Sequence, residues 1–284
     1  MSKSNILPDK NELKKAFEVI KGAQIPSVPD IVVNLHAEFE KEEPDIERIS
    51  DLVAKDQAIT GQVIKTVNSP LFGLQQPVES IPQAVVLLGL NKVKNLVTAA
   101  AFQSKIQAKS PIAVQIWHDS LSVAQVAMKI AQHIHDISQD EAYLAALLHN
   151  CGAMLLAEKF PGYEDLLRIE NEFPAALIDR ENRRLGSNHV VIGYMFAKHW
   201  KLPERVCQAI YHHHDLRCEK IKECKLRALI AILKLAHQLV MEKYTINDTE
   251  SLERIQFLSY PKQELMLDEE FLDGLRTDAF LGQD

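Results

Sequence analysis

The sequence predicts an all-α protein, and two observations lead to this fold class. Apolar residues recur three or four positions apart, as on one face of a helix, and Ile59, Val63 and Val67 form one such stripe. No segment shows the sustained alternation of apolar and polar residues that is typical of a half-buried strand. Residues that favour helix starts and ends flank the stripes, so the helices can be delimited in order.

In the first third of the chain, capping residues and prolines delimit the helices. Asp9 can cap the first helix and Gly22 ends it, and two prolines make residues 24–29 an extended connector. We expect a turn at residues 68–73 and a second connector at 77–82. One further helix is expected to start near Asp30. Four others are expected to span 46–53, 58–67, 83–88 and 91–103.

Beyond the Ser110-Pro111 pair we expect a second group of helices. Ser138 can cap a helix that ends at His149, with Glu141 placed three residues on as in a capping box. Gly186 closes a later helix and Asn188 caps the one that follows it. The remaining expected helices span 112 to about 135, 153–160, 174–185, 189–200, 203 to the 212–214 histidines, and 226–241, with one or two short helices within 257–280.

The change of character around residue 108 predicts a boundary between two helical parts. We therefore expect four segments. They are an N-terminal helix at 1–21, an N-terminal helical subdomain at 22–108, a helical bundle at 109–245 and a C-terminal extension at 246–284.

Composition excludes several classes of function. The net charge of −7 and the pI near 5.9 argue against a general nucleic-acid surface. No apolar run reaches the ~20 residues that span a bilayer, and the first residues lack a secretory signal, so we expect a cytoplasmic protein. The four cysteines form no CxxC pair and are expected to be reduced thiols. Eleven histidines are the unusual feature.

Two stretches suggest specific chemistry. Residues 142–156 contain two apolar helical runs interrupted by His149-Asn150-Cys151-Gly152. Residues 83–103 form two helices joined by Gly89-Leu90, which is a shape that DNA-reading units also use. The second of these helices carries only Lys92 and Lys94 at its start and is otherwise apolar, so a buried hairpin is favoured over DNA binding.

Short motifs stand in a definite order along residues 17–216. They are 25–29, 67–73, 84–90, Trp117-His118 with Ser120, 147–152, Leu185-Gly186 with His189 and Gly193, 200–203, and Ala209-Ile210 followed by His213-His214. This ordered set resembles the HDOD family, the HD-related output domains of bacterial signalling proteins. The resemblance implies an all-helical fold in which an HD-domain-like bundle packs on an N-terminal helical subdomain. It also implies a regulatory or interaction module without one established common enzymatic activity.

The resemblance further implies a set of candidate metal ligands. These residues fall where related HD hydrolases hold metal: His118, His149, Asn150, His189, His213 and His214. The chain departs from the hydrolase pattern at Asn150 and His237, where those enzymes have carboxylates, and at Ala153, where they have a lysine. We expect Asn150 and His237 to line the pocket of this degenerate site.

Losing two carboxylates is unfavourable for phosphoester hydrolysis. A carboxylate can bridge two cations and help lower the pKa of a water between them, whereas an amide supplies one neutral oxygen. A Mg²⁺ site is therefore not expected, while several imidazoles suit a transition metal such as Zn, Ni, Fe or Mn.

Each histidine also has a purely structural interpretation. His118 and His149 can be core histidines, and His189 can simply help to start its helix. Adjacent helical positions point about 100° apart, so we expect His213 and His214 at the pocket and His212 towards solvent. We expect Cys151 to be partly exposed beside the pocket and to be a packing residue rather than a nucleophile. His133, His135 and His199 are expected at the surface.

The favoured function is a non-catalytic module of bacterial signal transduction that binds a partner protein or a small effector. The alternative is a metal-dependent phosphohydrolase, phosphodiesterase-like, with altered ligands. Direct DNA binding by residues 83–103 is a third option. No membrane association is expected.

Overall fold

The computed structural model describes residues 7–23, 26–106, 108–168, 173–216, 218, 220–242, 252–268 and 270–275. Every regular element in these ranges is a helix, which confirms the predicted all-α class. Ile25 of the first motif and the outer parts of the predicted 1–21 and 246–284 segments lie outside the described residues. No described helix combines the length and the apolar content needed to cross a bilayer.

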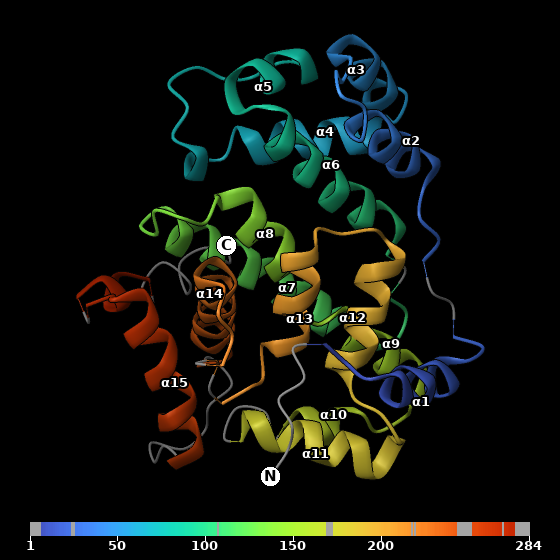
Figure 1. The fold of residues 1–284 in the computed structure, drawn as a ribbon, viewed down its shortest axis with the longest axis vertical. Helices are drawn as coiled ribbons and strands as arrows, with labels where there is room; N and C mark the ends of the chain where they lie inside the picture. The colour runs from blue at the N-terminus through green and yellow to red at the C-terminus, as the bar shows by residue number, and fades with distance from the viewer. Residues whose placement is uncertain are drawn as a thin grey trace.

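The N-terminal helical part forms an upper tier in Figure 1. Its helices begin at or within two residues of their predicted starts because local capping fixes them: Asp45 accepts from the amide of Arg48, and Asp56 from those of Ala58 and Ile59. The tier comprises α2 (Asp30–Phe39), α3 (Ile46–Ala54), α4 (Gln57–Val67), a short 3₁₀ helix (Pro70–Phe72), α5 (Ile81–Leu88) and α6 (Leu90–Lys105).

The predicted α5–α6 hairpin has a tertiary packing role. α6 packs against α4 and α5 and extends down onto α8 of the bundle, and half of its residues are buried. Lys94 is half-buried and its ammonium lies 5.2 Å from the centre of the Phe39 ring. One of the two lysines at the start of this helix therefore packs inside the tier.

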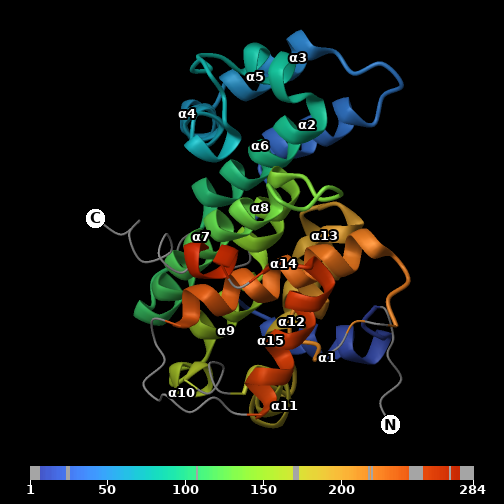
Figure 2. The same cartoon turned by 90° about the vertical axis from the view of Figure 1, so that its left-hand side faces the viewer.

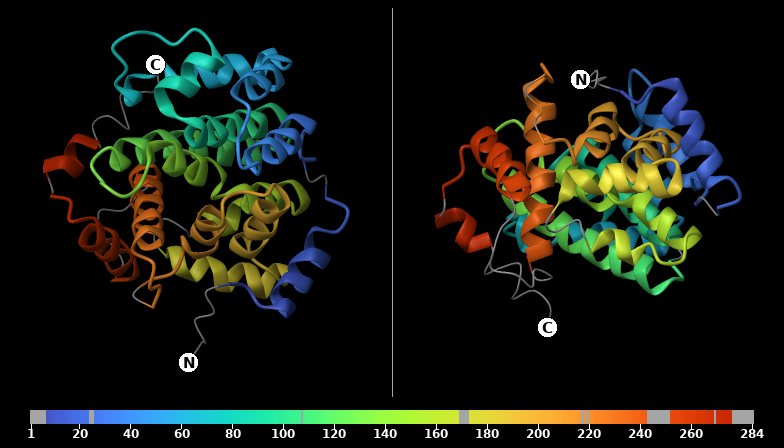
Figure 3. Two further views of the ribbon diagram at one scale, coloured as in Figure 1. Left: turned by 45° about the horizontal axis from the view of Figure 1, so that its top comes forward. Right: turned by 90° about the horizontal axis from the view of Figure 1, so that it is seen from below.

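The larger part below is a bundle, seen from two further directions in Figure 3. α7 packs against α8, α9 and α14, while α12 packs against α9 and α13. The bundle helices are α7 (Pro111–Ala131), α8 (Gln139–Leu148), α9 (Cys151–Lys159), α10 (Glu164–Leu167), α11 (Pro174–Leu185), α12 (His189–His199), α13 (Glu204–His212) and α14 (Cys224–Met241).

Two details of the bundle differ from the sequence prediction. α7 ends at Ala131, four residues before the predicted His135. Ser138 is at the N-cap position of α8 but makes no capping hydrogen bond. Glu141, the expected reciprocal partner, instead accepts from Arg205 Nη1 at 2.8 Å, so a tertiary ion pair replaces the capping box.

Both terminal helices pack on the bundle rather than on the upper tier. α1 (Lys10–Ile20) begins in a capping box formed by Asp9 and Glu12 and contacts α12 and α9. α15 (Leu252–Leu265) lies along α14 and also contacts α11 (Figure 2). The connector that follows α1 therefore runs from the bundle up to the tier.

An aromatic cluster fastens the tier to the bundle. Phe102 of α6 makes edge-on contacts with Phe196 and Trp200 of the bundle, at 5.4 Å between ring centroids in each case. The buried Trp200 also donates from Nε1 to the carbonyl of Pro26 in the connector at 3.1 Å. Aromatic pairs of this kind add roughly 0.5–1.5 kcal/mol beyond their buried area.

Candidate functional site

Five histidines gather inside the bundle, and four different helices or helix ends bring them there. They are His149 after α8, His189 at the start of α12, His213 and His214 after α13, and His237 in α14. Their exposed fractions run from 1% to 7%. Neighbouring rings lie 4.3–5.3 Å apart between centroids, from His237 through His149 and His213 to His189 and His214. We call this set the histidine cluster.

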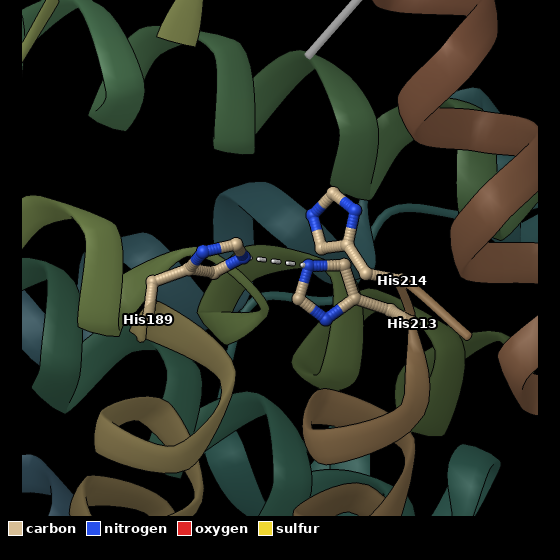
Figure 4. Close-up of side chains that lie close together, drawn as sticks. All are labelled: His189, His213 and His214. Atoms are coloured by element: carbon tan, nitrogen blue, oxygen red, sulfur yellow. Dashed lines mark hydrogen bonds between the residues drawn. The ribbon is translucent and has the colours of Figure 1, made fainter. Parts of the chain in front are cut away.

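Three members of the histidine cluster converge closely enough to share one ion. Ring nitrogens of His189, His213 and His214 all lie within 4.8 Å of one another. Figure 4 shows the His189 and His213 rings facing each other, with 3.4 Å between their Nε2 atoms, and His214 beside them. In the described part of the chain, this is the group whose spacing suits a metal ion.

A buried carboxylate holds the His189 ring. Glu181 of α11 is fully buried and accepts from the backbone amide of His189 at 3.0 Å and from its Nδ1 at 2.8 Å. Tyr163 donates its hydroxyl to the other oxygen of Glu181. This is the arrangement that fixes the tautomer of a ligating histidine, because Nδ1 carries the proton and Nε2 keeps its lone pair towards the centre.

Backbone contacts orient His213 in the same sense. Its Nδ1 donates to the carbonyl of Ile210 at 2.7 Å, so Nε2 is left as the lone-pair nitrogen facing His189. Burial, followed by the nearby imidazoles, holds the pKa of His213 well below its usual value. A neutral imidazole with a fixed ring is the state in which histidine binds metals.

His149 and His237 are joined to each other. His149 donates from Nδ1 to the carbonyl of Ala146 at 2.6 Å, so its Nε2 must accept. That acceptor lies 2.7 Å from Nδ1 of His237, which therefore donates. Both nitrogens of His149 are thus used within the protein, and this histidine supports the cluster without offering a free lone pair.

The other predicted site residues are placed as follows. His118 is exposed on α7, outside the cluster, because Ile116, Ser120 and Val123 are the side chains that α7 turns inward. Asn150 is 7% exposed, and its Oδ1 accepts no hydrogen bond from any described residue.

His212 and Cys151, next to the cluster in the sequence, are more buried than expected. His212 was expected to face solvent, but it is buried, and its Nδ1 lies 2.7 Å from Oδ2 of Asp215 in the turn that follows. Cys151 is buried rather than partly exposed, and burial raises the pKa of its thiol to about 12. A thiol in that state is inert, as expected of a packing residue.

The donor set fits a transition metal better than a hard ion. Within the described residues, the group that meets at the centre is made of imidazoles alone, and Glu181 stands behind His189. Imidazole suits Zn²⁺, Ni²⁺ and Fe²⁺, whereas Mg²⁺ requires oxygen ligands. The unsatisfied Oδ1 of Asn150 is a second sign that this region accommodates a water or an ion.

Known proteins resemble this chain in sequence over part of their length. An uncharacterized protein of Treponema pallidum (strain Nichols) is 27% identical over 198 residues, which cover 68% of this chain and 38% of that protein. Cyclic di-GMP phosphodiesterase CdgJ of Vibrio cholerae is 29% identical over 174 residues, 58% of this chain and 40% of that protein. The matches therefore span about two fifths of the length of these curated relatives.

Structural comparison agrees on the fold. The crystal structure of an HDOD domain protein with unknown function from Geobacter sulfurreducens superposes with a TM-score of 0.67 at 24% identity, covering 96% of this chain and 98% of that one. The sequence model of the HDOD domain matches residues 25–216, which is more than half of the chain. This chain therefore belongs to the HDOD domain family.

Proposed function

We propose that this chain is a cytoplasmic regulatory module of bacterial signal transduction that binds a partner protein or a small effector and does not hydrolyse phosphoesters. The observation that carries the proposal is the state of the histidine cluster. Its five imidazoles are nearly fully buried, and the carboxylate of Glu181, which contacts one of them, holds the His189 ring.

Hydrolysis of a phosphoester by metals makes two demands on such a site. Bridging anions must hold the ions and lower the pKa of a water, and an open position must admit the substrate. His189 and His213 are 1% and 2% exposed, so little of the centre is open to a phosphoester in this conformation. Asn150 and His237 add no negative charge.

The cluster supports a structural and regulatory role instead. It joins the ends of α8, α12 and α13 to the middle of α14. A transition metal (Zn, Ni, Fe or Mn) held by His189, His213 and His214 would tie two of these helices together, because the free energy of metal binding adds to that of folding. The bundle would then present its surfaces to a partner as a rigid body.

A metal-dependent phosphohydrolase with altered ligands is the second candidate. Two observations favour it: the convergence of three imidazoles within 4.8 Å, and the Glu181 contact that orients one of them. The similarity to a protein named as a cyclic di-GMP phosphodiesterase points the same way, although it covers only 40% of that protein.

Metal analysis and a hydrolysis assay on one preparation separate the two candidates. The protein is purified without chelators, its metal content is measured, and cyclic di-GMP and bis(4-nitrophenyl) phosphate are offered with added Mn²⁺ or Fe²⁺. We expect no turnover above that of a His213→Ala variant. Turnover near the enzyme range of about 1 per second or more, lost in His213→Ala but kept when the exposed His135 is replaced by alanine, would establish the hydrolase.

A further inference from the structure

A cavity of about 620 Å³ lies where three parts of the chain meet, and no member of the histidine cluster lines it. The connector after α1 contributes Lys21 to Ala23, Pro26 and Ser27, and the end of α6 with the linker to α7 contributes Lys105, Ile106, Ala108 and Lys109. The bundle contributes residues of α9 and Phe196 of α12. Its size is typical of sites for small molecules, which span roughly 300–1,000 Å³.

The cavity has an apolar base and a basic rim. The buried side chains that line it are Phe102, Cys151, Met154, Leu155 and Phe196. The exposed or half-buried ones include four lysines, at positions 21, 105, 109 and 159, and a single carboxylate, Glu158. A cationic rim is unusual on a chain whose net charge is −7.

The charges on the rim are unevenly satisfied. Glu158 uses Oε1 to accept from the backbone amides of Lys109 and Ser110 at the start of α7, at 2.5 and 2.9 Å. Lys159 donates to the carbonyl of Lys21 at 2.7 Å. By contrast, within the described ranges the ammonium groups of Lys105 and Lys109 form no ion pair and no hydrogen bond.

We propose that this cavity binds a small organic phosphate, with its phosphate at the lysine rim and an apolar or aromatic body on the base. The inference rests on the proposed function, because it identifies the chemical class of the effector. A phosphate monoester carries about −1.5 to −2 charges near neutral pH and can approach several ammonium groups at once. It thus matches the surplus of positive charge better than a carboxylate with a single charge.

Occupancy of the cavity would connect the tier to the bundle. The ligand would touch the connector, the linker between α6 and α7, and the bundle itself, which are the segments that join the two parts. Trp200 is placed to report this event: its ring stacks on Phe196 at 5.7 Å, and its Nε1 bonds to Pro26, and both partners line the cavity. Binding should therefore change the tryptophan fluorescence.

The test compares 1-naphthyl phosphate with 1-naphthol by titration calorimetry at low salt, and tryptophan fluorescence during a titration with inorganic phosphate, which neither absorbs nor emits there, is a second signal. The two probes differ only by the phosphoryl group. We expect one site per chain, at least tenfold weaker binding of naphthol, competition by inorganic phosphate, and weakening by NaCl.

Variants locate the site. Lys105→Gln combined with Lys109→Gln should weaken binding of the phosphate by about fivefold to thirtyfold, as expected for the loss of two exposed charge contacts. The matched control combines Lys55→Gln and Lys65→Gln, which removes two exposed lysines of the upper tier and should change nothing. Ala108→Phe keeps every charge but fills the half-buried edge of the cavity, and should abolish binding.

The result that overturns the inference is specific. It fails if 1-naphthyl phosphate does not bind, if naphthol binds equally well, or if the Lys105/Lys109 variant binds like the wild type. The same probe keeps the proposed function separate, because cleavage of the ester releases fluorescent naphthol. Cleavage that His213→Ala abolishes would refute the non-catalytic role and leave the cavity standing, whereas absent binding without cleavage refutes the cavity alone.

Discussion

Replacing Gly152 by alanine should destabilise the bundle by about 2 kcal/mol or more. Gly152 lies in the first turn of α9 where this helix crosses α12. A Cβ added there would come 2.0 Å from the carbonyl oxygen of His189 and 2.7 Å from the amide nitrogen of Gly193. Both are backbone atoms, so no side chain can turn away to make room.

The expected destabilisation follows from these short distances. The two helices would have to separate by about 1.4 Å to reach the 3.4 Å at which ordinary contact begins. Overpacking of this kind costs typically 1–3 kcal/mol, and rigid neighbours place it near the upper end, about 3 kcal/mol. Alanine regains at most about 1 kcal/mol through its higher helix propensity, which leaves about 2 kcal/mol of net destabilisation.

Two other glycines give matched controls for the urea-unfolding midpoint. A Cβ on Gly193 would lie 3.0 Å from the γ-methyl group Cγ2 of Ile210 and at ordinary contact distance, 3.6 and 3.7 Å, from Cys151 Sγ and the Gly152 amide nitrogen, so Gly193→Ala should cost about 1 kcal/mol, less than Gly152→Ala. A Cβ on Gly61 in α4 meets nothing within 4 Å, so Gly61→Ala should stabilise by about 0.5–1 kcal/mol. A Gly152→Ala protein as stable as the wild type, with an unchanged urea slope, would refute the close packing of α9 on α12.

Three further predictions concern individual side chains. Glu181→Gln should lower the affinity of the protein for Zn²⁺ by about 10- to 100-fold in a competition titration, because a neutral amide accepts the hydrogen bond from His189 Nδ1 more weakly than a carboxylate does. Unchanged affinity, equal to that of the exposed Glu204→Gln control, would count against a role of Glu181 in orienting His189 for metal. With a disulfide reagent at pH 8, only the exposed Cys224 should react quickly, since Cys151, Cys207 and Cys218 are buried and burial raises the pKa values of Cys151 and Cys207 to about 12. Rapid titration of all four thiols in the native protein would disprove this. Burial, and then Lys94 and Lys201, lower the pKa of His36 from 6.5 to about 4. The unfolded chain therefore binds this proton first, and the free energy of unfolding should fall as pH drops from about 6.5 towards 4, less steeply in His36→Asn than in the His135→Asn surface control.

Local signals in the sequence predicted the fold well. The predicted capping residues Asp9 and Asn188, and the glycine at 186, mark helix ends through contacts within a few residues, so they can be recognised without tertiary information. Ser138 is the exception. Its predicted reciprocal partner, Glu141, has a stronger tertiary partner in Arg205, which lies 64 residues away.

The candidate site was predictable only in part. The short motifs indicated the four histidines at 149, 189, 213 and 214, and the structure brings these together with His237. His118 lies apart from the cluster. It is two residues from the inward-facing Ile116, and residues two apart on a helix lie on different faces. The motif placed His118 among the candidate metal ligands, whereas its position on the helix face placed it outside the site, and the structure agrees with the helix face.

Non-local partners explain what the sequence did not reveal. In the sequence, Glu181 is one polar residue on a polar-faced helix. In the structure it is buried in contact with Tyr163 and His189, and no sequence pattern indicates that burial. His212 is buried, and its ring contacts Asp215 in the turn after α13, which its position on the helix face did not indicate. The place of α15 was likewise undetermined. Its contacts with α14 include Phe257, whose ring lies 4.1 Å from the ammonium of the buried Lys234 and 6.2 Å from the centre of His214, and an ion pair between Glu264 and Arg227.

Single-turnover hydrolysis tests the central claim, a buried histidine cluster without catalytic power, most directly. The protein, loaded with Mn²⁺ or Fe²⁺, is held in excess over cyclic di-GMP so that even one slow event per chain is counted. We predict that the nucleotide remains intact at the level found with His213→Ala. Stoichiometric conversion by the wild type, absent in His213→Ala and retained in His135→Ala, would contradict the account.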